Sequence, residues 1–146
     1  METKDNSKIE EVFEREKQFL LKDGIVFTAF EASTQRGNIA TILHPEVMNG
    51  PGKYEAIRAV GKQFREDGYS IDTLTFIMAG RNMLKHSQKS LIVCMLNVVT
   101  GNIQIMTELF RVIHGNKIVF EPNSRHLTDK AKSGIIDEFM HGYENK

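Results

Sequence analysis

The fold of this chain is decided by residues 69–122, which read YSIDTLTFIMAGRNMLKHSQKSLIVCMLNVVTGNIQIMTELFRVIHGNKIVFEP. The stretch contains strand-like segments rich in β-branched and long apolar residues, at 71–80, 90–100, 102–114 and 117–121. Glycines punctuate them, at Gly80, Gly101 and Gly115. Turn residues between apolar runs of this length are typical of antiparallel hairpins. The sequence therefore predicts a continuous antiparallel meander, a bent sheet that encloses a pocket together with helices.

Segment 91–99 is apolar on both faces of the predicted strand, apart from Asn97. This pattern indicates a central strand that is buried from both sides. The next segment, 102–114, has mixed polarity. Together the two segments leave more apolar surface than one layer of helices covers, so we expect a homodimer.

Helical patterns precede and follow the meander. The first begins at a capping box that opens with Ser7. A second, amphipathic helix is predicted at 53–67, and Gly61 on its buried stripe indicates close approach to the sheet. A last helix is predicted at 128–143, with Thr128 as its cap.

Residues 25–34 fit two conformations. Apolar residues occupy both faces of a possible strand up to Glu31, whereas Val26, Ala29 and Phe30 would share one face of a short helix. Propensity favours a strand, and the length is compatible with either. From these residues alone both alternatives stay open.

With 146 residues, the chain is expected to form a single domain, 1–146, with a core of its own. Nineteen Lys and Arg balance nineteen Asp and Glu, so the formal net charge is zero. The usual electrostatic argument for binding to nucleic acid or to an anionic membrane is therefore missing. The polar N-terminus does not read as a signal peptide, and no apolar stretch approaches a membrane span. The single cysteine, Cys94, lies in an apolar run, and no Cys/His spacing suggests zinc. We expect a cytoplasmic protein without a metal or other cofactor.

Two stretches, 50–58 and 108–118, read GPGKYEAIR and ELFRVIHGNKI. The first is similar to the Gly-x-x-Ala-Ile segment that opens the long helix of the NTF2-like superfamily. The second is similar to the strand and Gly-Lys-Ile hairpin near the C-terminus of that family. Glu16-x-x-Phe19, leading to Gly24 and Phe30, resembles members whose first helix breaks at a glycine before a short second helix. In this order the motifs resemble the SnoaL-like branch of the superfamily, whose small domains are cone-shaped.

The resemblance implies an α+β fold in which a curved antiparallel sheet wraps around N-terminal helices, as a cone-like barrel. The NTF2-like core would span 7–122, and the helix at 128–143 would be an addition that closes or occupies the mouth of the cavity. The resemblance also favours a helix for residues 25–34. The chain has no Trp, which departs from the aromatic-rich strands common in the family and weakens an argument for ligand stacking.

Four polar residues interrupt apolar patterns and are catalytic candidates. Glu16 lies on the apolar stripe of the first helix, where burial would raise its pKa and make it a general base; alternatively it reaches solvent. His44 follows a short strand and is either a proton-transfer group at the rim or a loop histidine bonded to backbone. Asp72 and Asn97 would be a base or an oxyanion donor if they point inward. Otherwise Asp72 faces solvent, and Asn97 ends the buried part of its strand.

The expected ligand site is a pocket lined by adaptable apolar side chains, although the same residue types are ordinary in a core. Its candidate residues are Met78, Met95, Met106 and Phe110, with Tyr54 as a hydroxyl donor or a packing residue. Basic residues also gather in one loop, as an anion-binding loop or as solvated surface: Arg81, Lys85, His86 and Lys89.

The function expected is binding of an apolar or weakly polar small molecule by an NTF2-like domain. One alternative adds isomerase, lyase or hydrolase chemistry, with a buried carboxylate or histidine as general base. The other is a dimeric protein-interaction module of the roadblock or profilin-like type, without catalysis. That module requires residues 25–34 to be a strand, so their conformation distinguishes the alternatives.

Overall fold

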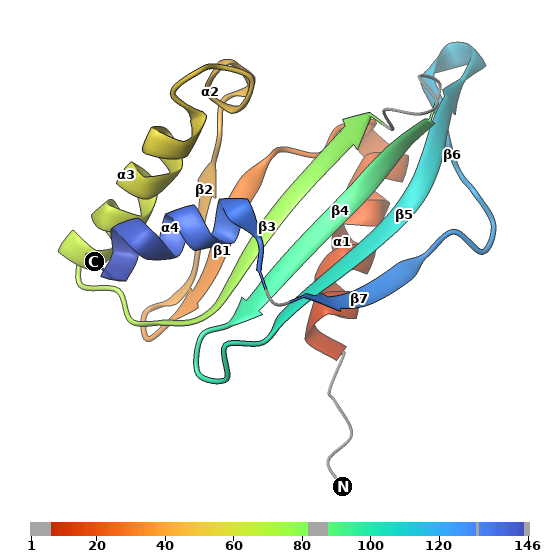
Figure 1. Cartoon of the computed structure of the whole chain (residues 1–146). Coiled ribbons are helices and arrows are strands. Elements are labelled where there is room, and N and C mark those ends of the chain that lie inside the picture. Colours follow the sequence, from red (N-terminus) through yellow and green to blue (C-terminus); the bar gives the residue numbers. More distant parts are fainter. Residues whose placement is uncertain (1–6, 82–87, 131, 145–146) are drawn as a thin grey trace, which may run out of the picture.

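The computed structural model describes residues 7–81, 88–130 and 132–144. Within these residues the chain is an α+β protein with four α-helices and a seven-strand antiparallel sheet (Figure 1). The elements are α1 (Ser7–Asp23), β1 (Ala29–Thr34), β2 (Gly37–Ile42), α2 (Pro45–Met48), α3 (Lys53–Glu66), β3 (Ile71–Arg81), β4 (Gln88–Asn97), β5 (Ile103–Ile113), the 3₁₀ turn η1 (His114–Asn116), β6 (Lys117–Phe120), β7 (His126–Lys130) and α4 (Gly134–Glu144).

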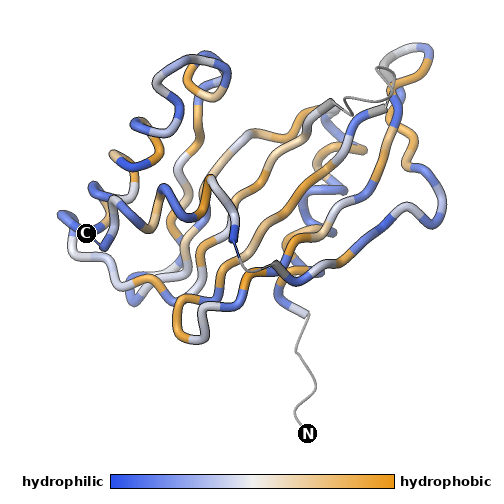
Figure 2. Tube along the Cα trace, in the orientation of Figure 1, coloured by the Kyte–Doolittle hydropathy of each residue, from blue (hydrophilic) through white to orange (hydrophobic). Residues whose placement is uncertain are grey.

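The predicted meander is confirmed. Strands β3, β4, β5 and β6 are consecutive antiparallel neighbours. The β1–β2 hairpin extends the sheet beyond β3, and the strand order is β2-β1-β3-β4-β5-β6. Strand β7 pairs with the part of β5 that the short β6 leaves free. Figure 2 shows hydrophobic residues along the central strands, as expected for a sheet buried from both sides.

Helices cover both faces of the central strands. On one face α1 lies behind the sheet as drawn in Figure 1, and its Phe13 joins a core with Val93 of β4. On the other face α3 and α4 pack, and Phe139 of α4 joins a core with Cys94 of β4. Neighbouring residues of one strand thus enter opposite cores, as strand geometry requires.

The expected cone-like barrel is not formed, because the sheet is neither closed nor strongly curled. A cone needs a sheet that wraps one helical layer and leaves its outer face free. Here both faces are apolar and both carry helices, so the sheet stays open between two layers. Helices of the same chain thus cover both apolar faces of the central strands. The homodimer was expected because these faces were more than one layer of helices could cover.

Residues 29–34 form strand β1, not the short helix favoured by the resemblance. Both edges of β1 are paired, one with β2 and the other with β3. Phe30 and Ala32 are fully buried in the α3–α4 core, whereas Glu31 and Ser33 face the α1 side. Two hydrogen-bonded edges and a buried face outweigh a local pattern that is compatible with a helix.

The C-terminal helix begins at Gly134 and not at Thr128. Thr128 instead lies in β7, opposite Ile105 of β5, because β6 leaves that edge of β5 open for pairing. Ser133 accepts a hydrogen bond at its Oγ from the Ile136 amide at 3.5 Å and caps the helix. From there α4 packs beside α3 (Figure 1).

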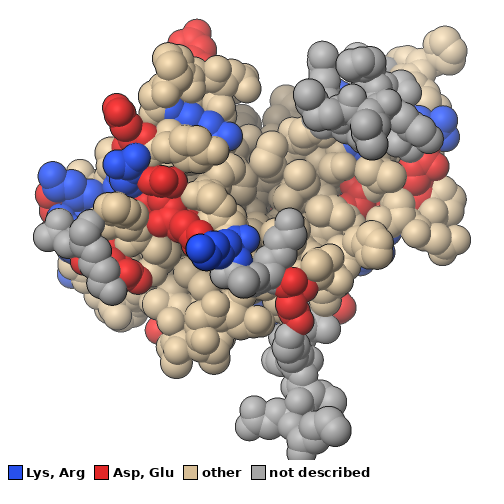
Figure 3. Space-filling view, viewed as in Figure 1, with Lys and Arg blue, Asp and Glu red and all other residues tan. Residues whose placement is uncertain are grey.

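Acidic and basic side chains are intermingled over α3 and α4 on the face drawn in Figure 3. This mixture agrees with the zero formal net charge of the chain. In the described part of the chain, no helix has both the length and the apolar character needed to span a membrane.

Candidate functional site

A row of polar side chains crosses four strands on the α1 face of the sheet. Asn38 of β2 is opposite Ser33 of β1, and Ser33 is opposite Thr73 of β3. Thr73 is in turn opposite Asn97 of β4. Because side chains alternate along strands, these amides and hydroxyls all point to the side of the sheet that α1 covers.

Polarity decreases along the strands from this row. In the next row, Glu31 is opposite Thr75, and Thr75 is opposite Met95. One row further, Ile77 is opposite Val93, and both belong to the core beneath α1. The polar rows lie beneath the first half of α1, and the apolar row continues into the packed core.

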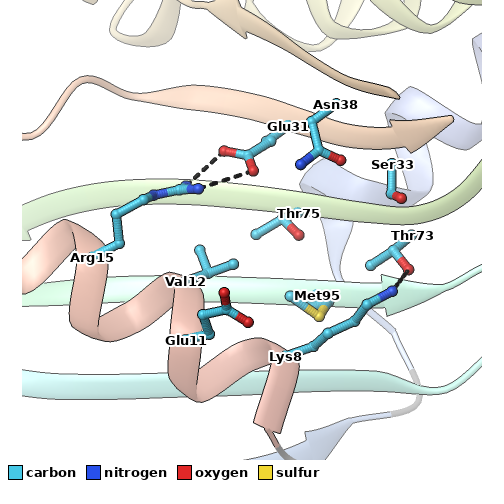
Figure 4. Close-up of a pocket in the computed structure, with 10 residues that line it drawn as sticks. All are labelled: Lys8, Glu11, Val12, Arg15, Glu31, Ser33, Asn38, Thr73, Thr75 and Met95. Carbon is cyan, nitrogen blue, oxygen red and sulfur yellow. Dashed lines mark hydrogen bonds and ion pairs between the residues drawn. The ribbon is translucent and has the colours of Figure 1, made fainter. Parts of the chain in front are cut away.

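A groove lies between α1 and the polar rows. Its main part has a volume of about 320 Å³ and continues into a second hollow of about 230 Å³. Figure 4 shows the residues that line the main part, namely Lys8, Glu11, Val12, Arg15, Glu31, Ser33, Asn38, Thr73, Thr75 and Met95. The second hollow shares three of these and adds Asn97, Thr100, Asn102 and Gln104.

Two buried threonines form the floor of this groove. Thr75 is 4% exposed and Thr73 is 8% exposed. The Thr73 hydroxyl accepts a hydrogen bond from the Lys8 ammonium at 3.5 Å. Among the described residues the Thr75 hydroxyl has no hydrogen-bond partner. The Thr75 oxygen is not one of the fully enclosed polar atoms that lack a partner, so it is open to the groove, where a water or a ligand can hydrogen-bond to it.

An ion pair joins α1 to the sheet at one end of the groove. The Arg15 guanidinium donates two hydrogen bonds to the Glu31 carboxylate, at 3.1 and 2.6 Å (Figure 4). It also donates to Glu16 at 3.3 Å. The hydrogen bond to Glu31 is the main factor that raises the pKa of Arg15. Arg15 is therefore a charged group whose hydrogen-bonding capacity is largely occupied by protein carboxylates.

Glu16 lies next to Arg15 and outside the lining of the groove. Its pKa is raised, chiefly because partial burial removes water from the carboxylate. The Arg15 charge opposes this shift, and the Glu31 charge adds to it. Glu16 thus has the electrostatic character expected of a general base, but it is beside the groove.

The other catalytic candidates are dispersed. His44 is exposed, and its Nδ1 accepts a hydrogen bond from the Glu46 amide at 3.1 Å, which caps the short helix α2. Asp72 is exposed near the start of β3. Asn97 lines the second hollow, where its Oδ1 accepts hydrogen bonds from the amides of Val99 and Thr100.

The candidate ligand-binding residues are also separated. Met95 lines both parts of the groove. Met106 and Phe110 are packed in the core beneath α1. Met78 packs against the core on the opposite face, and Tyr54 is exposed at the start of α3. Of all the candidate site residues, the groove brings together Met95 and Asn97.

Most groove residues were missed from the sequence. Thr73 and Thr75 alternate with Leu74 and Phe76, so a strand with hydroxyls on one face was visible in the pattern. The local sequence did not indicate that Lys8 would be placed over that face. The basic loop at 81–89, with Lys85 and His86, lies largely outside the described residues.

A buried carboxylate fixes α1 to the sheet beside the groove. Glu108 of β5 is 6% exposed and accepts hydrogen bonds from Lys17 and from Arg125, each at 2.7 Å. Arg125 also pairs with Glu14 of α1, and its guanidinium lies over the Phe13 ring. Lys17 and Glu14 of α1 are thus both held by this cluster, and Arg15 is held by Glu31, so the helix keeps a defined position over the sheet.

In the part of the chain that the structure describes, no cluster of three or more His, Cys, Asp or Glu residues could hold a metal ion. No protein-family model, curated protein or solved structure matches the chain. The chemical capacity of the groove follows from its own side chains. Hydroxyl, amide and ammonium groups beside Val12 and Met95 suit a small polar molecule with a short apolar part.

Proposed function

We propose that this protein is a small-molecule-binding domain of the NTF2-like type, and that its ligand is a small polar molecule bound between α1 and the sheet. The observation that carries the proposal is the groove of about 320 Å³ with buried hydroxyls in its floor. A filled interface between α1 and the sheet would have left no such space. Of the ten residues that line the main part, Val12 and Met95 are apolar and the others are polar or charged, so the groove suits a ligand held mainly by hydrogen bonds.

The order of elements supports the NTF2-like type in part, because residues 29–34 form a strand where the resemblance favoured a short second helix. A first helix precedes a hairpin, a long helix and a four-strand meander that ends in the tight turn at Gly115. The groove lies between the first helix and the sheet, where a cone-like domain would have its cavity. Catalysis is not part of the proposal, because neither Glu16 nor His44 lines the groove.

The test is to fill the groove. Ser33 lines it from β1, and Ser33→Leu would place a larger side chain inside it. Ser70→Leu is the matched control, because Ser70 is exposed and outside the lining. Saturation-transfer NMR with a library of small polar metabolites should detect ligands of the wild type and of Ser70→Leu that Ser33→Leu does not bind. Ligands that bind all three proteins equally would contradict the groove as the site.

A second candidate function is supported by the strand conformation of residues 29–34, which the dimeric interaction module requires. Strand β2 is an edge of the sheet, and its residues Gly37–Ile42 include no charged side chain. Exposed edges usually carry charges or proline that prevent pairing with another chain. Phe27 and Ile42, which are 62% and 61% exposed, lie at one end of this edge. We propose a second copy of this chain as the partner of the β2 edge.

Light scattering after size exclusion tests this second candidate. The wild type should elute as a dimer, and Ile42→Lys should convert it to a monomer of 16.6 kDa. Val99→Lys is the control, because Val99 is 83% exposed in the β4–β5 turn and away from β2. A monomeric wild type at high concentration would exclude the homodimer and leave ligand binding untouched.

A further inference from the structure

Among the described residues, Lys8 is the cation of the groove that has no carboxylate partner. Arg15 is occupied by Glu31 and Glu16. The Lys8 ammonium has one contact among the described residues, the weak hydrogen bond of 3.5 Å to the Thr73 hydroxyl. Lys8 lines both parts of the groove, so its charge lies at their junction. An anionic group placed there would gain a charge-assisted hydrogen bond at no cost to an existing ion pair.

Neutral hydrogen-bonding groups surround this cation. Thr73 and Thr75 offer buried hydroxyls, and Ser33 and Asn38 continue the polar row toward β2 (Figure 4). On the other side of Thr73, the Asn97 Oδ1 is used by backbone amides, which leaves its amide NH₂ as a donor. An apolar ligand would leave these groups without partners, so the groove favours a ligand with several hydroxyl or carbonyl groups.

The carboxylates limit the charge of the ligand. Glu31 is held by Arg15, but Glu11 is an exposed carboxylate in the lining without a described ion-pair partner. A second negative charge on the ligand would be opposed by Glu11. Phosphate groups are usually bound by arginine forks or by several basic groups, and Arg15, the arginine among the described lining residues, is already paired. The charged residues of the lining sum to zero, and Lys8 is the one cation among them without a described carboxylate partner, so the groove has a place for one anionic group and not for two.

We propose that the groove binds a compact polyhydroxylated monocarboxylate. Its carboxylate lies against Lys8 and the Thr73 hydroxyl, and its hydroxyl groups bond to Thr75, Ser33 and Asn38. This assignment rests on the proposed function, since it names the ligand class of the same groove. It replaces the Met-lined apolar pocket expected from the sequence with a site that recognises a charge and an array of hydroxyls.

Calorimetry on the full chain tests the assignment with three probes of similar size. D-Gluconate carries one carboxylate, D-sorbitol is its neutral counterpart, and 6-phosphogluconate adds a phosphate. Gluconate should bind about tenfold more tightly than sorbitol, because a hydrogen bond to a charged group is stronger than a neutral one. Phosphogluconate should bind no better than gluconate. Equal affinity for gluconate and sorbitol, or the tightest binding for phosphogluconate, would overturn the assignment.

Two variants locate the contacts. Lys8→Gln should remove the preference for gluconate over sorbitol, whereas Lys62→Gln should leave it unchanged, because Lys62 is an exposed lysine of α3 outside the groove. Thr75→Val keeps the shape of the side chain and should weaken both probes about fivefold. A preference that survives Lys8→Gln would contradict the role of Lys8.

The outcomes also separate this assignment from the proposed function. If none of the three probes binds, while Ser33→Leu abolishes binding of other molecules from the metabolite library, the ligand class is wrong and the groove remains the site. If no molecule of either set distinguishes Ser33→Leu from the wild type, both the ligand class and the proposed function are wrong.

Discussion

Gly61 of α3 and Gly142 of α4 occupy reciprocal positions where the two helices meet. A Cβ atom added at Gly61 would overlap the carbonyl oxygen of Phe139, and one added at Gly142 would overlap the carbonyl oxygen of Arg58. Each glycine thus lies directly against the backbone of the other helix. This contact holds α4 beside α3 and lets Phe139 reach Phe30 of β1, with ring centroids 4.8 Å apart.

Substitution of either glycine should separate the helices. Alanine is the better helix former by about 1 kcal/mol, but overpacking against backbone costs about 1–3 kcal/mol or more. We expect Gly61→Ala and Gly142→Ala each to lower the free energy of unfolding by about 2 kcal/mol in urea titrations. Gly134→Ala is the control, because nothing lies near its added Cβ, and it should be neutral or slightly stabilising. Variants as stable as the wild type would show that the helices are not in backbone contact.

Glu108 should contribute more to the free energy of unfolding than a surface carboxylate does. Its side chain is 7% exposed and bonded to both Lys17 and Arg125. Glu108→Gln would leave two cations without their buried partner, and we expect a loss of about 2 kcal/mol, below the 3–5 kcal/mol of a fully buried pair because the cations reach solvent. Glu121→Gln removes the more exposed pair with Arg111 and should cost less than about 1 kcal/mol. Equal losses in urea titrations would contradict a structural role for Glu108 under α1.

Glu16 should make stability depend on pH in a defined direction. Its pKa in the folded protein is raised above the ordinary value of 4.5, chiefly by desolvation. The folded state therefore binds the proton more firmly than the unfolded state, and the free energy of unfolding falls as pH rises from 4.5 through the folded pKa. Glu16→Gln imitates the protonated form, so its stability relative to the wild type should increase across this window. Carbon-detected NMR titration of the Glu16 carboxyl gives the folded pKa directly, and a value at or below 4.5 would contradict the desolvation.

The corrected start of the last helix has its own test. Ser133→Ala removes the side-chain cap of α4 and should cost about 1 kcal/mol. Thr128→Ala at an exposed position of β7 should cost less than about 0.5 kcal/mol. The opposite order in thermal unfolding would place the helix start at Thr128, as the sequence pattern suggested.

Elements stabilised by interactions between neighbours along the chain could be predicted from the sequence, and elements that depend on distant segments could not. The meander could be predicted because alternation and glycine turns are local. Burial from both sides, expected for 91–99, holds for residues 91–96, where Val93 and Cys94 enter opposite cores, but Asn97 and Val99 are exposed. Residues 29–34 could not be decided locally, since their strand is stabilised by partners on both sides, β2 and β3. Strand β7 was missed for a related reason: its pairing depends on how short β6 is.

The candidate site was less predictable than the fold. Asn97 was singled out because it interrupts the most apolar strand, and Met95 because its side chain is adaptable, and both line the groove. Thr73 and Thr75 look like ordinary strand residues, and Lys8 looks like a solvated helix residue. These residues form a site because the fold brings Lys8 next to threonines that are distant in sequence, and no local pattern predicts that contact.

By itself the sequence determined that residues 69–122 form an antiparallel meander, because turn chemistry and side-chain alternation act between neighbours along the chain. Only the tertiary structure decided that helices occupy both faces and that the sheet stays open. It also decided that the first half of α1 lies over hydroxyls and amides and leaves a polar groove there. The physical reason is that this groove depends on the register of four strands and on the position of α1, which is held by ion pairs to Glu31 and Glu108, residues remote from it in sequence.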